Sequence, residues 1–426
     1  MSRDTLEVAI ETALRPGEFI SFRTRYEFVE GLESLASEVL KLVKTDAARS
    51  SGLFETFIAG CFEKANEVDD SGASFATFVR DLFCAWIRAR AKAGQDRDET
   101  AKRLLAWADK DEYGICFGIE REVVKAFDKP GLAAFERQVR ARLARAPEGD
   151  FERRRAGDML RAVYARQRNV PAYTALAGGS PSPADCFAIA TMLHRKQKEA
   201  LAWVERGLAV KGEQFESTAA QELTTLKRDL LAKLGRGSEA LADAWAEFRA
   251  FPAAHTYEDF MKFVPKTDSP TWHAKAMETI QEADLSSAID LLVATKEFDR
   301  LVSRLREASD AKLEDLHHFT VDPIAHRLEK DHPDVAARLF RAMAVRTLNA
   351  RKAKYYDNAL SNLETAKNCF ARAGRTADWD ALVAQVRTDH KRKTWFMERF
   401  EKLVAGHGPS NEPSFLERAR KRWTPT

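Results

Sequence analysis

Histidines and an aspartate gather between residues 317 and 332, and they are the chain's richest group of potential metal ligands. His318, Asp322 and His326 are spaced four residues apart, which would align three ligands on one continuous helix. Asp322-Pro323, however, predicts a helix cap and a first helical residue, so it would break that alignment. We therefore interpret these residues, with His317 and His332, as solvated histidines around a turn. We expect no bound metal.

The second group is basic. Ten arginines and four acids lie between residues 137 and 168, a local charge of +6, and we call this segment the arginine-rich stretch. Residues 390–393 and 418–422 form two smaller basic clusters. Such clusters contact nucleic-acid phosphates, but they also form the solvated faces of amphipathic helices, and we favour the second interpretation. The candidate interaction surface comprises Arg153, Arg154, Arg155, Arg161, Arg392 and Lys393.

Catalytic motifs are missing from the sequence. It has no phosphate-binding glycine loop, no Gly-x-Ser-x-Gly elbow and no His-Glu-x-x-His pair. Gly178-Gly179 precedes Ser-Pro and is interpreted as part of a linker, and Asp69-Asp70 is interpreted as a helix cap. We predict no catalytic residues, no cofactor and no enzymatic activity, although a site assembled from distant residues stays possible.

Composition favours a folded helical protein of the cytoplasm. Of 426 residues, 45% are hydrophobic and 31% charged, the net charge is +3, and Gly (20) and Pro (14) are few. No apolar run is long enough to span a membrane, and the N-terminus lacks a signal-peptide core. The cysteines are interpreted as core residues in a reducing compartment; they are Cys61, Cys84, Cys116, Cys186 and Cys369.

Helical periodicity begins at Glu27, and its clearest unit is a hairpin over 223–252. Gly235-Arg236-Gly237 separates two apolar stripes, Ser238 is the predicted cap of the second helix, and Pro252 ends it. Neither helix can bury its stripe alone, so hairpins must stack. A small residue recurs where helices begin, at Ala200, Ala240, Ala288 and Ala336. We predict an all-α fold, an α-solenoid of stacked hairpins without significant sheet.

The domain organisation follows from one helix-breaking hexapeptide, Gly178 to Pro183. We predict an N-terminal helical region over 1–177, a linker at 178–183, and a C-terminal helical-repeat region over 184–426. A further helix, Phe75 to Ala91, carries apolar residues so densely that it should be buried nearly all round.

Two family resemblances follow from these patterns. Within residues 187–300, the Lys233-Leu-Gly235 turn, the Glu239-Ala-Leu241 helix opening and Pro252 resemble tetratricopeptide hairpins, although Thr224, Lys227 and Arg228 depart from that family's first helix. Residues 355–403 resemble the helical region that follows SWIM zinc fingers in bacterial proteins, but the Cys-x-Cys and Cys-x-His zinc ligands are absent. Residues 22–145, with Trp86 and Asp111-Glu-Tyr-Gly114, resemble an uncharacterised bacterial all-helical family related to it.

These patterns favour a non-catalytic protein-interaction scaffold or adaptor, because solenoids present long surfaces to other macromolecules. One or more protein partners are expected. The alternative is a nucleic-acid-associated protein that uses the basic segments 137–168, 390–393 and 418–422. The sequence does not predict the oligomeric state.

Overall fold

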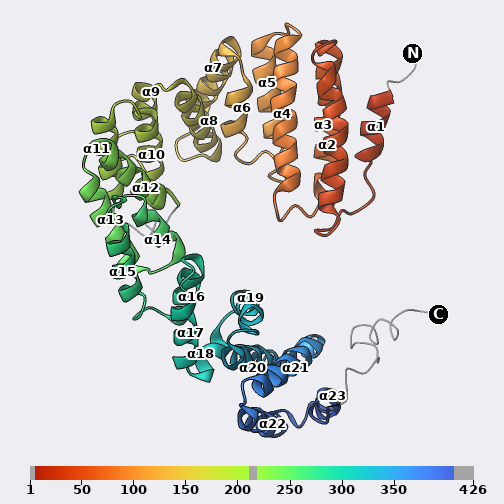
Figure 1. The fold of residues 1–426 in the computed structure, drawn as a ribbon. Coiled ribbons are helices and arrows are strands. Elements are labelled where there is room, and N and C mark those ends of the chain that lie inside the picture. Colours follow the sequence, from red (N-terminus) through yellow and green to blue (C-terminus); the bar gives the residue numbers. More distant parts are fainter. Residues whose placement is uncertain (1–4, 211–217, 407–426) are drawn as a thin grey trace, which may run out of the picture. The chain divides into compact units, whose positions relative to one another are not determined.

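A computed structural model describes residues 5–210 and 218–406 of the chain (Figure 1). This part is all-helical, as composition predicted, and its one sheet-like contact is an isolated bridge between Ile20 and Val68. Within it, no helix combines the length and apolar character that a membrane crossing requires. The chain divides into two compact units, Met1–Leu230 and Leu231–Thr426.

The first unit is built from helices that pack mainly on their neighbours in the chain. They are α1 (Thr5–Ala13), α2 (Arg25–Leu42), α3 (Ala47–Lys64), η1 (Ala65–Glu67), α4 (Ser74–Lys92), α5 (Arg97–Asp109), α6 (Glu120–Ala126), α7 (Lys129–Arg145), α8 (Phe151–Gln167), α9 (Val170–Ala177), α10 (Pro183–Met192) and α11 (Gln197–Leu208). Helix α12 (Thr218–Lys233) crosses from this unit into the next.

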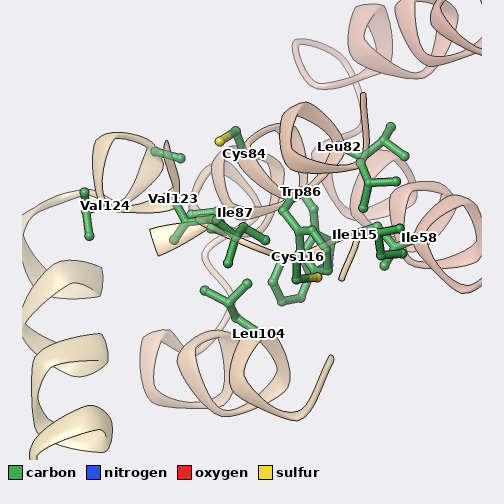
Figure 2. Close-up of a cluster of buried hydrophobic side chains, with 14 of the residues drawn as sticks. Ile58, Leu82, Cys84, Trp86, Ile87, Leu104, Ile115, Cys116, Val123 and Val124 are labelled. Atoms are coloured by element: carbon green, nitrogen blue, oxygen red, sulfur yellow. The ribbon is translucent and has the colours of Figure 1, made fainter. Parts of the chain in front are cut away.

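Helix α4 is the centre of the first unit's core. The dense apolar pattern predicted burial nearly all round, and all seven of the large side chains behind that prediction are buried: Phe75, Phe78, Val79, Leu82, Phe83, Trp86 and Ile87. Figure 2 shows Trp86 among apolar side chains from several elements, including Ile58 of α3 and Leu104 of α5. The Trp86 indole N–H donates to Glu55 at 3.0 Å, so its polar atom is satisfied.

The second unit is also helical throughout its described part. Its elements are α13 (Gly237–Ala250), α14 (Ala254–Met261), α15 (Ser269–Thr279), α16 (Leu285–Ala294), α17 (Phe298–Glu307), α18 (Asp310–Asp315), α19 (His318–Leu328), α20 (Pro333–Asn349), η3 (Ala353–Tyr355), α21 (Tyr356–Arg372), α22 (Thr376–His390) and α23 (Thr394–Val404).

Packing between helices is local in the chain. Among the described helices, the substantial pairs join elements no more than three apart: α3 with α4, α4 with α6 and α6 with α8 in the first unit, and α18 with α20, α20 with α21 and α21 with α23 in the second. The recurrent alanines contribute to this packing. Ala200, Ala240, Ala288 and Ala336 are each the fourth residue of their helix, and each is completely buried.

The turn after α12 differs from the prediction in its cap. Gly235 adopts a left-handed φ of +77°, and the Arg236 N–H donates to the Leu231 carbonyl at 2.8 Å, which ends the helix. Helix α13 then begins at once, so Arg236 is its N-cap and Ser238 lies inside the first turn. The prediction of Ser238 as the cap is therefore wrong, because the helix already begins at Gly237 and Ser238 is its second residue.

The contacts divide the chain elsewhere than at the predicted linker. Helices α9 and α10 flank residues 178–183, pack on each other and lie in the same unit, and Ser182 caps α10 through a capping box with Asp185. The division between compact units falls instead between Leu230 and Leu231, within α12. The predicted regions 1–177 and 184–426, with a linker at 178–183, stay a prediction.

Candidate functional site

The arginine-rich stretch occupies α7 and α8, and its side chains bond mainly to neighbouring helices. Arg137 donates to Asp98 at 2.7 Å, and Arg142 donates twice to Asp109, at 2.7 and 2.8 Å. Asp98 and Asp109 belong to α5, on which α7 packs. Arg140 pairs with Glu136 within α7 and stacks over the Tyr164 ring of α8. These arginines therefore join helices to each other.

Three arginines of the candidate interaction surface, Arg153, Arg155 and Arg161, bond to other parts of the fold. Arg153 donates to the carbonyls of Leu143 and Ala146 at the end of α7, both at 3.1 Å. Arg155 donates to the Ala108 carbonyl and lies 3.6 Å from Asp109. These contacts satisfy carbonyls that the helix ends leave without intrahelical partners.

Arg161 holds the most buried carboxylate of this group. Its Nε donates to Asp185 at 2.8 Å, and the Asp185 side chain is only 8% exposed. Burial alone would raise the pKa of Asp185, but hydrogen bonds from Ser182 and the charge of Arg161 outweigh it and lower that pKa. The Tyr173 hydroxyl donates to the same carboxylate at 3.2 Å, and burial raises the Tyr173 pKa. The cluster links α8, α9 and α10.

Four arginines of the stretch are exposed and form no side-chain hydrogen bond or ion pair with the described residues: Arg145, Arg154, Arg166 and Arg168. Arg154 is thus the nominated residue of this stretch that remains available to a partner. Of the smaller basic clusters, residues 418–422 lie outside the described residues. Residues 390–393 lie between α22 and α23, where Arg392 is exposed and Lys393 donates to the Nδ1 of buried His390 at 2.7 Å.

His318, Asp322 and His326 lie on α19, His317 is its N-cap and His332 is the N-cap of α20, and here one prediction is wrong. Helix α19 runs continuously through Pro323 instead of starting there. Burial of Val321, Ile324, Ala325 and Leu328 on its inner face stabilises it despite the backbone hydrogen bond that proline removes. His318, Asp322 and His326 therefore do share one helix. His326 contacts Glu329 at 2.5 Å and Asp322 at 3.8 Å, and no group of three ligands suited to a metal ion occurs in the described ranges.

The second unit contains a hydrogen-bonded relay of Tyr257, His273 and Glu297 that the sequence did not predict. The Tyr257 hydroxyl lies 2.8 Å from His273 Nδ1, and His273 Nε2 lies 3.1 Å from Glu297 Oε1. A neutral His273 with its proton on Nε2 satisfies both contacts, accepting from Tyr257 and donating to Glu297. Burial and the charge of Glu297 raise the pKa of Tyr257, so its hydroxyl stays protonated. The three residues come from three segments, and their spacing matches no motif.

The relay borders an aromatic cluster of the second unit. Trp245 lies 5.1 Å from Phe260 and 5.2 Å from Trp272 between ring centroids, and Phe248 lies 5.1 Å from Phe260. Phe248 and Phe260 are fully buried, whereas Trp245 is half-buried. The cluster is thus part of the core of the second unit, and the relay is its polar edge.

An open depression of about 560 Å³ elsewhere in the second unit is lined by Arg306, Asp310, Asp334, Arg338 and Arg375. Its charges are matched: Arg306 donates to Asp334 at 2.7 Å, Arg338 to Asp310 at 2.8 Å, and Arg375 pairs with Asp378. With its cations paired in this way, the depression presents no excess charge to a ligand.

Taken together, fold and site define a protein whose described part is all-helical and in which several arginines of the arginine-rich stretch join neighbouring helices. Residues 153–399 match the family of unknown function DUF6880, from within α8 to within α23. The match covers more than half of the chain, and the chain belongs to this family. Comparison with curated proteins gives no match.

Proposed function

We propose that this protein is a non-catalytic interaction scaffold built on an α-solenoid, in the cytoplasm of a bacterium. The observation that carries the proposal is the local packing: helices contact neighbours one to three positions away in the chain, the pattern expected when hairpins stack in sequence. Such a stack presents an extended surface, and holding another protein is the usual work of that surface.

Two finer relationships belong to the same proposal. The hairpins within residues 187–300 are tetratricopeptide-like, and residues 355–403 are related to the helical region that follows SWIM zinc fingers. The buried Ala200, Ala240 and Ala288 at the fourth helical position support the first, because a small residue there lets paired helices approach closely.

The relay of Tyr257, His273 and Glu297 resembles a catalytic arrangement, but its properties support a protein without catalytic activity. A tyrosine activated as a nucleophile or base needs a lowered pKa, and the pKa of Tyr257 is raised. The contacts of His273 with Tyr257 and Glu297 are therefore best explained as polar links between helices.

The alternative, a nucleic-acid-associated protein, loses most of its support in the arginine-rich stretch. Six of the ten arginines there bond within the fold, including Arg153, Arg155 and Arg161. A surface that binds phosphates needs cations that are exposed and unpaired. Arg154 meets both conditions, as do Arg145, Arg166 and Arg168.

The test is affinity capture by the intact, full-length protein at physiological salt, with and without nuclease. A scaffold should retain the same protein partner after nuclease treatment, and the purified partner should bind with defined stoichiometry in calorimetry. Loss of every partner on nuclease treatment would support the nucleic-acid alternative and contradict the scaffold.

A further inference from the structure

Two basic turns of the second unit lie next to each other. The turn from α20 to α21 carries Arg351, Lys352 and Lys354, and the turn from α22 to α23 carries Lys391, Arg392 and Lys393. We call these six residues the turn cluster. Helix α21 packs on both α22 and α23 (Figure 1).

Two contacts fix this arrangement at the start of each helix. The Tyr356 ring, at the start of α21, lies 5.8 Å from the Phe396 ring, near the start of α23. Arg399 of α23 also donates to Asp357 of α21 at 3.2 Å. Tyr356 and Phe396 are buried, so the helix starts are held by core packing. The six cations, within five residues of these rings, therefore form one surface.

The turn cluster carries excess positive charge. Five of its members are exposed, and none of the six forms an ion pair with a carboxylate of the described chain. Two acids lie within the same turns or directly beside them: Asp357, which is occupied by Arg399, and exposed Asp389. The local charge is thus +4. Burial, and after it the charge of Arg351, lowers the pKa of Lys393, which places the two turns within electrostatic reach of each other.

An exposed aromatic ring lies within this surface. Tyr355 is 42% exposed, and the ammonium group of Lys354 lies 4.7 Å from its ring centroid. Single-stranded nucleic acids are held by this combination, in which cations contact phosphates and an unpaired base stacks on an aromatic face. In a duplex the bases are already stacked on one another, so Tyr355 could not be used.

We propose that the turn cluster and Tyr355 form a binding surface for single-stranded nucleic acid. The cations neutralise phosphates and release their counterions, and the Tyr355 ring stacks on one base. This activity is separate from the scaffold function and does not rest on it. An acidic protein segment would satisfy the cations but would make no use of the tyrosine face.

The test uses the full-length protein and a fluorescein-labelled oligothymidylate, with binding followed by anisotropy as salt is raised. Each phosphate contacted adds about 0.7 to the slope of log K against log salt, so six cations limit the cluster's contribution to about 4. The double variants Arg351→Glu/Lys352→Glu and Lys391→Glu/Arg392→Glu should each weaken binding about tenfold or more and lower that slope. A duplex of the same length should bind more weakly.

The matched control is Arg195→Glu/Lys198→Glu, which changes the net charge equally at two exposed cations in the turn before α11 and at the start of that helix. It should leave the affinity unchanged, and circular dichroism should give the same helicity for all variants. Tyr355→Ala should weaken oligothymidylate binding roughly tenfold while Tyr355→Trp preserves it.

Three outcomes would overturn the proposal. The first is no binding at low salt, and the second is an equal loss of affinity in the Arg195→Glu/Lys198→Glu control. The third is binding of polyglutamate or polyphosphate as tight as that of oligothymidylate, with no effect of Tyr355→Ala, which would show a general polyanion surface.

Discussion

The arginine-rich stretch and the turn cluster both carry excess positive charge, yet they present it differently. In the stretch, six of ten arginines bond to carboxylates or carbonyls of the fold. In the turn cluster, none of six cations has a carboxylate partner in the described residues. The stretch has the larger charge in sequence, and the turn cluster has the larger share available to a ligand.

The difference arises from what lies beside each region. Helices α7 and α8 pack on α5 and α10, whose Asp109 and Asp185 lie within reach of Arg142 and Arg161. The turns that carry the cluster project from helix ends, where Asp357 is occupied and Asp389 is exposed. A basic segment is therefore a poor guide to a binding surface until the positions of nearby carboxylates are known.

The largest effect expected from this comparison is at Arg161. Replacing it by Met keeps an apolar stem but leaves the buried Asp185 carboxylate without its cation, which should lower the free energy of unfolding by about 3 kcal/mol. Urea denaturation followed by circular dichroism would measure it. Arg166→Met, at an exposed arginine of the same helix without a partner, should change stability by less than about 0.5 kcal/mol.

Equal stability of the two variants would show that Arg161 contributes no more to stability than the exposed Arg166, and it would contradict the view that the paired arginines of the stretch stabilise the fold.

The same contacts correct one expectation from sequence. Arg155 and Arg161 do not simply face solvent away from the α8 stripe, so reversing their charge would disturb the fold as well as any ligand. Arg154 is the residue of the three suited to charge reversal.

Sequence was a good guide to helices and a weaker one to polar contacts. Apolar periodicity placed α4 and its buried Trp86, because a stripe at helical spacing is a property of one segment. The relay of Tyr257, His273 and Glu297 could not be predicted, because its members are 16 and 24 residues apart and meet through tertiary packing. Local rules also misplaced the start of α19 at Pro323, where burial of the inner face outweighs a lost hydrogen bond.

Only one of the two turns of the turn cluster could be predicted from the sequence, again because tertiary packing brings the other beside it. Residues 390–393 form a continuous basic run, whereas Arg351, Lys352 and Lys354 look unremarkable until α21 packs on α23 and brings their turn beside that run. For the arginine-rich stretch, the sequence overstated the charge that is available to a ligand. Its ten arginines are conspicuous in sequence, while partners such as Asp98 and Asp109 lie 39 and 33 residues earlier in the chain.

A medium effect is expected from His390, which is buried beneath the turn cluster. Burial, and after it the charge of Lys393, lowers the pKa of His390 below its usual 6.5. As pH falls through about 6.5, the unfolded chain binds this proton before the folded protein does. The resulting loss of stability is absent above that pH and grows to the order of 1 kcal/mol below it.

The measurement is the free energy of unfolding between pH 7.5 and 5 for wild type and His390→Gln, in which the amide oxygen can still accept from Lys393. Slopes with pH are compared rather than absolute stabilities, because the substitution can itself alter packing. The variant should lose less stability on acidification. Identical slopes would show that His390 takes up its proton equally in the folded and unfolded chain.

The smallest expected effect has the opposite sign in the two regions. Arg392 is exposed between Lys391 and Lys393, without a carboxylate partner in the described chain. Arg392→Gln removes like-charge repulsion and should raise the free energy of unfolding by about 0.3 kcal/mol at low salt. Arg142→Gln instead breaks two hydrogen bonds to Asp109, at 2.7 and 2.8 Å, and should lower it by about 0.5–1 kcal/mol. Both differences should shrink as salt is added, since exposed charges are screened.

Thermal melts of the two variants and wild type at low and high salt would measure both changes in stability. Destabilisation by Arg392→Gln would mean that this arginine has a partner within the protein, and the turn cluster would then resemble the arginine-rich stretch.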